Sequence, residues 1–120
     1  MKSKEQKYLK AKEWAQNNPE KRRYTRWKSD IKKKYNLTPK DYFTLMDMQE
    51  GVCAICLSVQ KTKKGNTDTP WNLAVDHCHR TGKVRGLLCN ECNRAIGILG
   101  DTYMSVKRAA DYLEGFENEQ

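Results

Sequence analysis

The sequence predicts a small α+β protein in which α-helices flank a short β-hairpin. Its 120 residues are enough for one modest hydrophobic core. Proline-containing helix starts lie in the first 40 residues, whereas residues 71–88 have β-type patterning around a Thr-Gly turn. Paired cysteines stand on both sides of that β-type stretch and indicate a metal site that would brace it.

The first predicted helix precedes a proline. Tyr8, Ala11 and Ala15 lie on one face of a lysine-rich segment. This helix should end before the next helix start, where Asn18 can cap the new helix and Pro19 fits its first turn.

A second helix is expected to follow that start. Tyr24, Trp27 and Ile31 recur at helical spacing and should face the core. Basic residues surround this apolar face in a chain of net charge +8, so the segment either follows the phosphates of a nucleic acid or is a solvated helix surface. The candidates for phosphate contact are Arg22, Arg23, Arg26 and Lys28.

A third helix has a clear start and end. Thr38 is the expected cap, Pro39 fits the first turn, and Asp41 is placed near the positive end of the helix. Gly51 should close this helix. Residues 58–70 lack apolar periodicity and are predicted to form an exposed loop.

The hairpin is predicted from short β signals after Trp71. A first strand leads into residues 76–79, a Thr-Gly pair makes the turn, and residues 84–88 run back. A short helix over residues 93–99 should follow and end at a glycine. Asp101 is a candidate cap for the last helix.

The five cysteines favour metal binding over disulfides, because cytosolic thiols stay reduced. Cys53 and Cys56 form one C-x-x-C pair, and Cys89 and Cys92 form another. Four thiolates complete the tetrahedral shell of Zn²⁺, so we expect a structural zinc ion with no open position for substrate. Cys78 is left over and is expected to pack as a small buried residue.

A second group of polar residues is not explained by the zinc site. Asp76 at the end of a strand and Asn93 in the first turn of the adjacent helix can both offer oxygen to a hard dication, Mg²⁺ or Mn²⁺. His77 beside them could take a proton from a water that attacks a phosphodiester. His79 and Arg85 are candidates for holding phosphate oxygens. These residues predict a catalytic metal site at the end of the hairpin.

Taken together, these motifs resemble the phage recombination endonuclease VII family of HNH nucleases, also called His-Me finger or ββα-metal nucleases. The resemblance covers residues 52–100. It rests on Cys-Ala-Ile-Cys at 53–56, Val-Asp-His-Cys-His at 75–79, Thr-Gly-Lys-Val-Arg-Gly-Leu-Leu-Cys-Asn at 81–90 and Cys-Asn at 92–93, followed by Ile-Leu-Gly-Asp at 98–101.

This resemblance implies zinc at the four paired cysteines, a divalent metal at Asp76 and Asn93, and His77 as general base. It also implies metal-dependent hydrolysis of DNA that leaves 5′-phosphate and 3′-hydroxyl ends. Some family members have an acidic residue three positions after the asparagine, where this chain has Ile96. The expected organisation is a basic helical arm (1–50), a zinc-braced HNH nuclease core (51–100) and a C-terminal helix with an acidic tail (101–120).

Other functions stay open at this point. A zinc-stabilised module could bind DNA or RNA without cutting it, and a structural zinc protein or adaptor would use its helices for protein contacts. For a nuclease, the sequence leaves open branched, nicked or duplex DNA as substrate, and a homodimer as its assembly. Apolar runs fall far short of the roughly 20 residues that span a bilayer, and no secretory leader opens the chain. We therefore expect no membrane contact and a cytoplasmic location, in the host cell if a phage encodes the protein.

Overall fold

The computed structural model describes residues 6, 9–10, 13, 21–59 and 69–118. The elements described there are α2 (Lys21–Tyr35), α3 (Pro39–Met48), β1 (Ala74–His77), β2 (Val84–Leu88), α4 (Asn90–Ile98) and α5 (Tyr103–Glu117). The predicted α+β class is confirmed. The prediction of a first helix on Tyr8, Ala11 and Ala15, and of a helix start at Asn18 and Pro19, falls outside the described residues.

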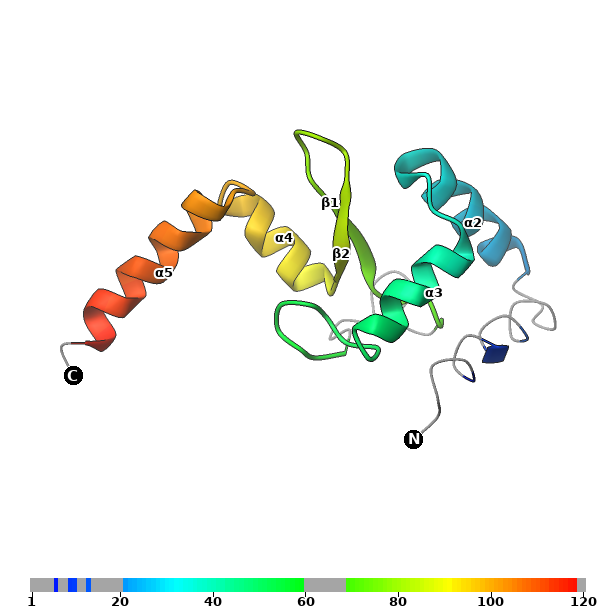
Figure 1. The fold of residues 1–120 in the computed structure, drawn as a ribbon, viewed down its shortest axis with the longest axis horizontal. Helices are drawn as coiled ribbons and strands as arrows, with labels where there is room; N and C mark the ends of the chain where they lie inside the picture. Colours follow the sequence, from blue (N-terminus) through cyan, green and yellow to red (C-terminus); the bar gives the residue numbers. More distant parts are fainter. Residues whose placement is uncertain (1–5, 7–8, 11–12, 14–20, 60–68, 119–120) are drawn as a thin grey trace.

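Helices α2 and α3 lie beside the hairpin (Figure 1). Their aromatic rings pack in the core that the two helices share with the hairpin. Trp27 of α2 stacks on Trp71 with ring centroids 4.8 Å apart and meets Tyr42 of α3 edge-on at 5.0 Å. The buried Tyr42 hydroxyl donates a hydrogen bond of 2.6 Å to the Leu73 carbonyl and accepts one of 3.1 Å from the Leu73 N–H. The predicted apolar face of α2 is thus confirmed, and it belongs to the same core as the hairpin.

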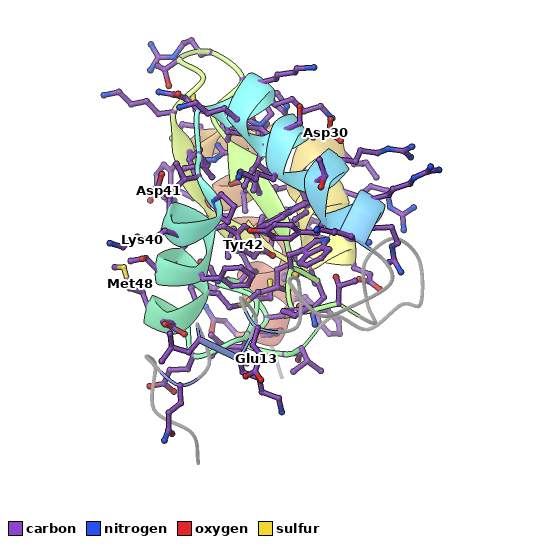
Figure 2. All side chains as sticks on the ribbon, turned by 90° about the vertical axis from the view of Figure 1, so that its right-hand side faces the viewer. Glu13, Asp30, Lys40, Asp41, Tyr42 and Met48 are labelled. Carbon is purple, nitrogen blue, oxygen red and sulfur yellow. The ribbon has the colours of Figure 1, made fainter. Side chains whose placement is uncertain are left out.

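Helix α3 begins as the sequence predicts. The Thr38 hydroxyl accepts a hydrogen bond from the Asp41 N–H (3.1 Å), and the Asp41 carboxylate accepts one from the Thr38 N–H (2.9 Å), which completes a capping box. These hydrogen bonds from Thr38 lower the pKa of Asp41. Figure 2 shows Tyr42 pointing inward from α3, whereas Lys40 and Met48 point outward.

Gln49, the residue after α3, connects that helix to β2. Its side-chain oxygen accepts a hydrogen bond of 2.9 Å from the Leu87 N–H. Its amide nitrogen donates to the carbonyl oxygens of Leu87 (2.9 Å) and Val52 (2.8 Å). The side-chain amide therefore pairs with the outer edge of β2 as a neighbouring strand would.

Replacing Gln49 with alanine is expected to destabilise the fold by about 1–3 kcal/mol, because the backbone groups of the fully buried Leu87 lose polar partners. Urea denaturation of the zinc-loaded protein would measure this loss. The neighbouring Met48 is 69% exposed, so Met48→Ala is a matched control that should leave stability nearly unchanged. Equal midpoints for the two variants would contradict this role of Gln49.

The hairpin is antiparallel, and α4 packs against both of its strands. Helix α4 begins at Asn90, three residues earlier than predicted, because the Cys89 sulfur caps it by accepting a hydrogen bond from the Cys92 N–H. Helix α5 follows α4 and points away from the rest of the molecule (Figure 1). Within the described parts of the chain, no helix has both the length and the apolar character needed to span a bilayer.

Two expectations from the sequence, one about a loop and one about a helix cap, are wrong. Thr69 is buried, whereas the sequence predicts an exposed loop over residues 58–70. Residues 60–68 of that loop lie outside the described part. The cap of α5 is Thr102, whose hydroxyl accepts a hydrogen bond from the Ser105 N–H, and not Asp101. A cap residue needs extended backbone, which Thr102 has, whereas Asp101 has a left-handed φ of +58°.

Candidate functional site

The four paired cysteines meet between the end of α3 and the start of α4. Their sulfur atoms all lie within 4.8 Å of one another, and those of Cys56 and Cys89 are 3.8 Å apart. Tetrahedral zinc with Zn–S bonds of about 2.3 Å separates its sulfurs by roughly 3.8 Å. The predicted ligands Cys53, Cys56, Cys89 and Cys92 are therefore brought together in a cluster that fits structural zinc.

Backbone groups favour the thiolate form of this cluster. The Ile55 N–H donates to the Cys53 sulfur and the Cys92 N–H donates to the Cys89 sulfur, both at 3.4 Å. Cys89 also lies at the positive end of α4, where a negative charge is stabilised. These contacts orient the ligands in the way that outer hydrogen bonds support metal sites.

Cys78 does not belong to the cluster found among the described residues. It is half-buried and not buried as predicted, because β1 ends at His77 and Cys78 already lies in the hairpin turn. The Cys78 N–H donates to the Lys83 carbonyl, and its own carbonyl accepts from the Gly82 N–H. Hydrogen bonds from Thr81 lower the pKa of the Cys78 thiol to about 7.

Asp76 and Arg85 form a bidentate ion pair at the end of the hairpin. Arg85 donates from Nε to Asp76 Oδ2 (2.7 Å) and from Nη2 to Asp76 Oδ1 (2.9 Å). The strand register explains the pairing: Asp76 opposes Gly86 while His77 opposes Val84, so Arg85 is the extra residue of a β-bulge. A bulge re-aims a side chain that regular alternation would direct to the other face of the sheet.

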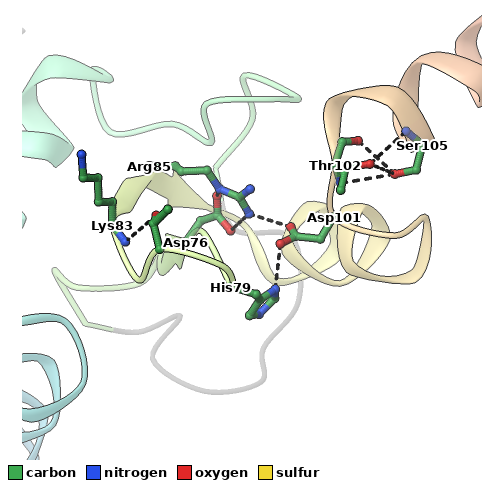
Figure 3. A network of polar contacts seen from close by, with 8 residues as sticks. Asp76, His79, Lys83, Arg85, Asp101, Thr102 and Ser105 are labelled. Atoms are coloured by element: carbon green, nitrogen blue, oxygen red, sulfur yellow. Dashed lines mark hydrogen bonds and ion pairs between the residues drawn. The ribbon is translucent and has the colours of Figure 1, made fainter.

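Asp101 extends this ion pair to the connection between α4 and α5 (Figure 3). Its Oδ1 accepts from Arg85 Nη2 at 2.6 Å, and its Oδ2 lies 2.7 Å from His79 Nδ1. The hydrogen bond from Arg85, followed by that from His79, lowers the pKa of Asp101. The two carboxylates in turn raise the pKa of Arg85. The result is a continuous polar network of Asp76, Arg85, Asp101 and His79.

His77 occupies the last position of β1 and is half-buried. Its ring lies 5.2 Å from the ring of Tyr35, at the end of α2, and 4.8 Å from the ring of His79, in an edge-on contact. The imidazole therefore packs against one ring from the end of α2 and one from the turn that follows β1.

Asn93 lies on α4, the helix that packs on the hairpin. It is half-buried and stands three residues before Ile96, which contacts the core, so the two share one side of the helix. This position places Asn93 on the same hairpin–helix unit as Asp76 and His77.

The predicted phosphate-binding residues of α2 lie on several sides of that helix. Arg22 and Arg26 are exposed and one turn apart, whereas Arg23 is half-exposed. Lys28 lines a groove of about 470 Å³ between α2 and the start of α3, together with Lys32 and Lys40. The basic residues thus form a broad positive surface on several sides of α2, and they do not line up along one face of the helix.

Sequence reasoning missed two side chains of the site region. Gln49 gave no signal, because its partners on β2 are distant in the sequence. Asp101 was expected as a helix cap and as the last residue of the motif at 98–101, without a role in the site. The signal in the sequence is the preceding Gly100, because a glycine after a helix indicates a turn. In the structure Gly100 has a φ of +106°, and the turn leaves the Asp101 side chain available for other contacts.

Comparison with known proteins adds family information. A family model described as recombination endonuclease VII matches residues 28–115, which extends from α2 into α5. The Gene 59 protein of Mycobacterium phage D29 is 39% identical over 90 residues, which cover 74% of this chain and 50% of that relative. The Gene 59 protein of Mycobacterium phage L5 is 39% identical over 90 residues, covering 74% and 51%. The chain thus spans about half the length of these curated relatives. No solved structure matches it significantly.

Proposed function

This chain belongs to the recombination endonuclease VII family, and we propose that it is a metal-dependent DNA endonuclease of the HNH type that hydrolyses phosphodiester bonds. The observation that carries the proposal is the position of Asp76, His77 and Asn93 on one hairpin–helix unit, within the segment that matches the family. The four-cysteine cluster supports it by bracing that same unit.

His77 is the proposed general base. Its imidazole takes a proton from the water that attacks the phosphorus atom, which requires the neutral ring. The rings of Tyr35 and His79 pack against the imidazole and so restrict its rotation. Orientation of this kind is a large part of what a positioned base contributes.

Asp76 and Asn93 are the proposed ligands of Mg²⁺ or Mn²⁺. Carboxylate and amide oxygens are the donors that such hard cations prefer, and a bound cation would neutralise charge on the scissile phosphate and the leaving oxygen. Asp76 is paired with Arg85, yet a carboxylate offers about four acceptor positions and Arg85 uses two. The ion pair therefore leaves acceptor positions on Asp76.

Arg85 and His79 are the proposed phosphate-binding residues beside the base. The bonds of Arg85 to the two carboxylates use Nε and Nη2, so the Nη1 donors are the ones proposed to bind a phosphate oxygen. The His79 side chain is 66% exposed, and with Nδ1 facing Asp101 its Nε2 is the atom assigned to substrate.

A second candidate function is favoured by one contact. In a zinc-stabilised module that binds nucleic acid without cutting it, a carboxylate near phosphate needs a cation beside it. Arg85 is such a cation, since it pairs with both oxygens of Asp76. This module would use the same cysteine cluster and the same basic helix.

The two functions are separated by incubating zinc-loaded protein with supercoiled plasmid. A nuclease nicks or linearises the plasmid when Mg²⁺ or Mn²⁺ is added and leaves it intact when the added metal is omitted. A binding module retards the plasmid in both conditions and yields no product. Parallel reactions with duplex, nicked and four-way junction DNA identify the preferred substrate, which we propose to be branched or nicked DNA.

The basic surface of α2 is proposed to bind the DNA backbone through Arg22, Arg23, Arg26 and Lys28. The double variant Arg22→Ala/Arg26→Ala is expected to bind all sequences more weakly and to lower the salt slope of log K by about 0.9 for each lost phosphate contact. Fluorescence anisotropy at several salt concentrations measures this slope. Lys107→Ala/Arg108→Ala on α5 removes the same charge as a control. An unchanged slope in the α2 variant would place that face away from DNA.

We further propose that the protein acts as a homodimer, because one active site cuts one strand per visit. Helix α5 supports this assembly: it points away from the body, and Tyr112, Leu113 and Phe116 are exposed along its outer half (Figure 1). Sedimentation of the zinc-loaded protein would give its mass in solution. DNA in the cytoplasm of a host cell is the proposed partner, since the relatives are phage proteins.

A further inference from the structure

Asp101 contacts two different parts of the hairpin with its two oxygens. Oδ1 accepts a hydrogen bond from Arg85 on β2, and Oδ2 accepts from His79 in the turn after β1. The Asp101 side chain is only 15% exposed, although it belongs to the connection between α4 and α5. A carboxylate in this position joins that connection to the end of the hairpin (Figure 3).

The backbone around Asp101 is built to aim this side chain. Asp101 has φ +58° and follows Gly100 at φ +106°, where an added Cβ would lie only 3.0 Å from the Ser105 hydroxyl. Left-handed backbone is unfavourable for a non-glycine residue and persists where surrounding contacts hold it. Here the capping box of Thr102 and Ser105 holds the chain immediately after Asp101.

The contacts of Asp101 bear on the tautomer of His79 and on the orientation of the Arg85 guanidinium. A carboxylate that accepts from Nδ1–H of a neutral imidazole selects that tautomer and leaves Nε2 with its lone pair. For Arg85, Nη2 is shared between Asp76 and Asp101, so the guanidinium plane is fixed by two anions instead of one. This arrangement holds Arg85 against both oxygens of Asp76 in a single orientation.

We propose that Asp101 is a positioning residue for the candidate site. It accepts a hydrogen bond from Nδ1–H of His79, which turns Nε2 toward substrate so that the protonated ring donates to a phosphate oxygen, and it locks Arg85 onto Asp76. The connection between α4 and α5 thereby sets the geometry at the end of the hairpin. The effect on cleavage rests on the proposed nuclease function, whereas the effect on the His79 tautomer does not.

The variant Asp101→Asn tests this role, since asparagine tolerates the left-handed backbone while losing the charge. Asp111→Asn is the matched control, because Asp111 is an exposed carboxylate of α5 that pairs with Lys107 within the same helix. Both variants should keep the zinc content and circular dichroism of the parent protein. If Asp101→Asn fails to fold, Asp101→Ser is the second variant.

The first measurement is nitrogen NMR of the imidazoles at pH 8, where histidine is ordinarily neutral. The chain contains two histidines, so a His77→Gln background assigns the His79 signal. We expect the Nδ1–H tautomer in the parent and in Asp111→Asn, and a shift toward Nε2–H in Asp101→Asn. An unchanged tautomer in Asp101→Asn would overturn the proposal, whether or not the protein cuts DNA.

The second measurement is plasmid cleavage with Mg²⁺ or Mn²⁺. Asp101→Asn is expected to lower the rate roughly 10- to 100-fold, as loss of an outer carboxylate does at other sites, with DNA binding unchanged. His79→Gln in the Asp101→Asn background should slow cleavage less than it does in the parent, because the two residues act through one contact.

Cleavage by Asp101→Asn at the rate of Asp111→Asn would overturn the catalytic part of the proposal. If the parent cuts no DNA, the proposed function fails, and the tautomer alone decides the role of Asp101.

Discussion

Replacing Cys89 with serine is expected to abolish the folded state of the protein. Cys89 is fully buried, is one of the four clustered ligands, and caps α4 with its sulfur. Structural zinc contributes about 10–16 kcal/mol to the folding of small zinc domains, which is as large as the whole stability of an ordinary domain, about 5–15 kcal/mol. Far-UV circular dichroism and zinc content, measured on the purified variant, would report the loss.

The matched control is Cys78→Ser, which makes the same chemical change in the hairpin turn, outside the cluster. This control should keep zinc and melt close to the parent protein. Removing zinc from the parent with a chelator should reproduce the behaviour of Cys89→Ser. A Cys89→Ser protein that retains the melting temperature of Cys78→Ser would show that the cluster does not support the fold.

Replacing His77 with alanine is expected to lower DNA cleavage by about 10²- to 10⁴-fold, the contribution of a positioned general base. This loss corresponds to roughly 3–5 kcal/mol in the activation barrier. Folding should survive, because the half-buried ring contacts Tyr35 and His79 only at the edge of the core. The measurement is the rate of plasmid nicking at saturating Mg²⁺, together with zinc content and DNA affinity.

Lys83→Gln serves as the control for His77, since it neutralises an exposed side chain of the same hairpin without removing either ring contact of His77. It should cut at nearly the parent rate. Undiminished cleavage by His77→Ala would remove His77 as the base. Even the full expected effect is well below the acceleration that phosphate ester hydrolysis requires, up to about 20 kcal/mol or more, which is why the proposal also assigns a cation to Asp76 and Asn93.

Much of the local structure could be predicted from the sequence, because its causes lie within a few residues. Thr38, Pro39 and Asp41 define the start of α3 through hydrogen bonds that span three residues. The two C-x-x-C pairs have the spacing of zinc ligands, and all four cysteines meet in the fold. The apolar positions of α2 follow the helical repeat, and Trp27 and Ile31 do face the core.

The sequence by itself therefore determined the classes of element, the cysteine cluster and the residues that could carry chemistry. Only the tertiary structure decided which partners those residues have. Arg85 reaches Asp76 because a bulge re-aims it, and Asp101 reaches Arg85 and His79 because a left-handed turn directs it to the hairpin. The physical reason is range: caps and helical faces depend on neighbours in the chain, whereas the charge environment of a side chain depends on groups that only packing brings within hydrogen-bond distance.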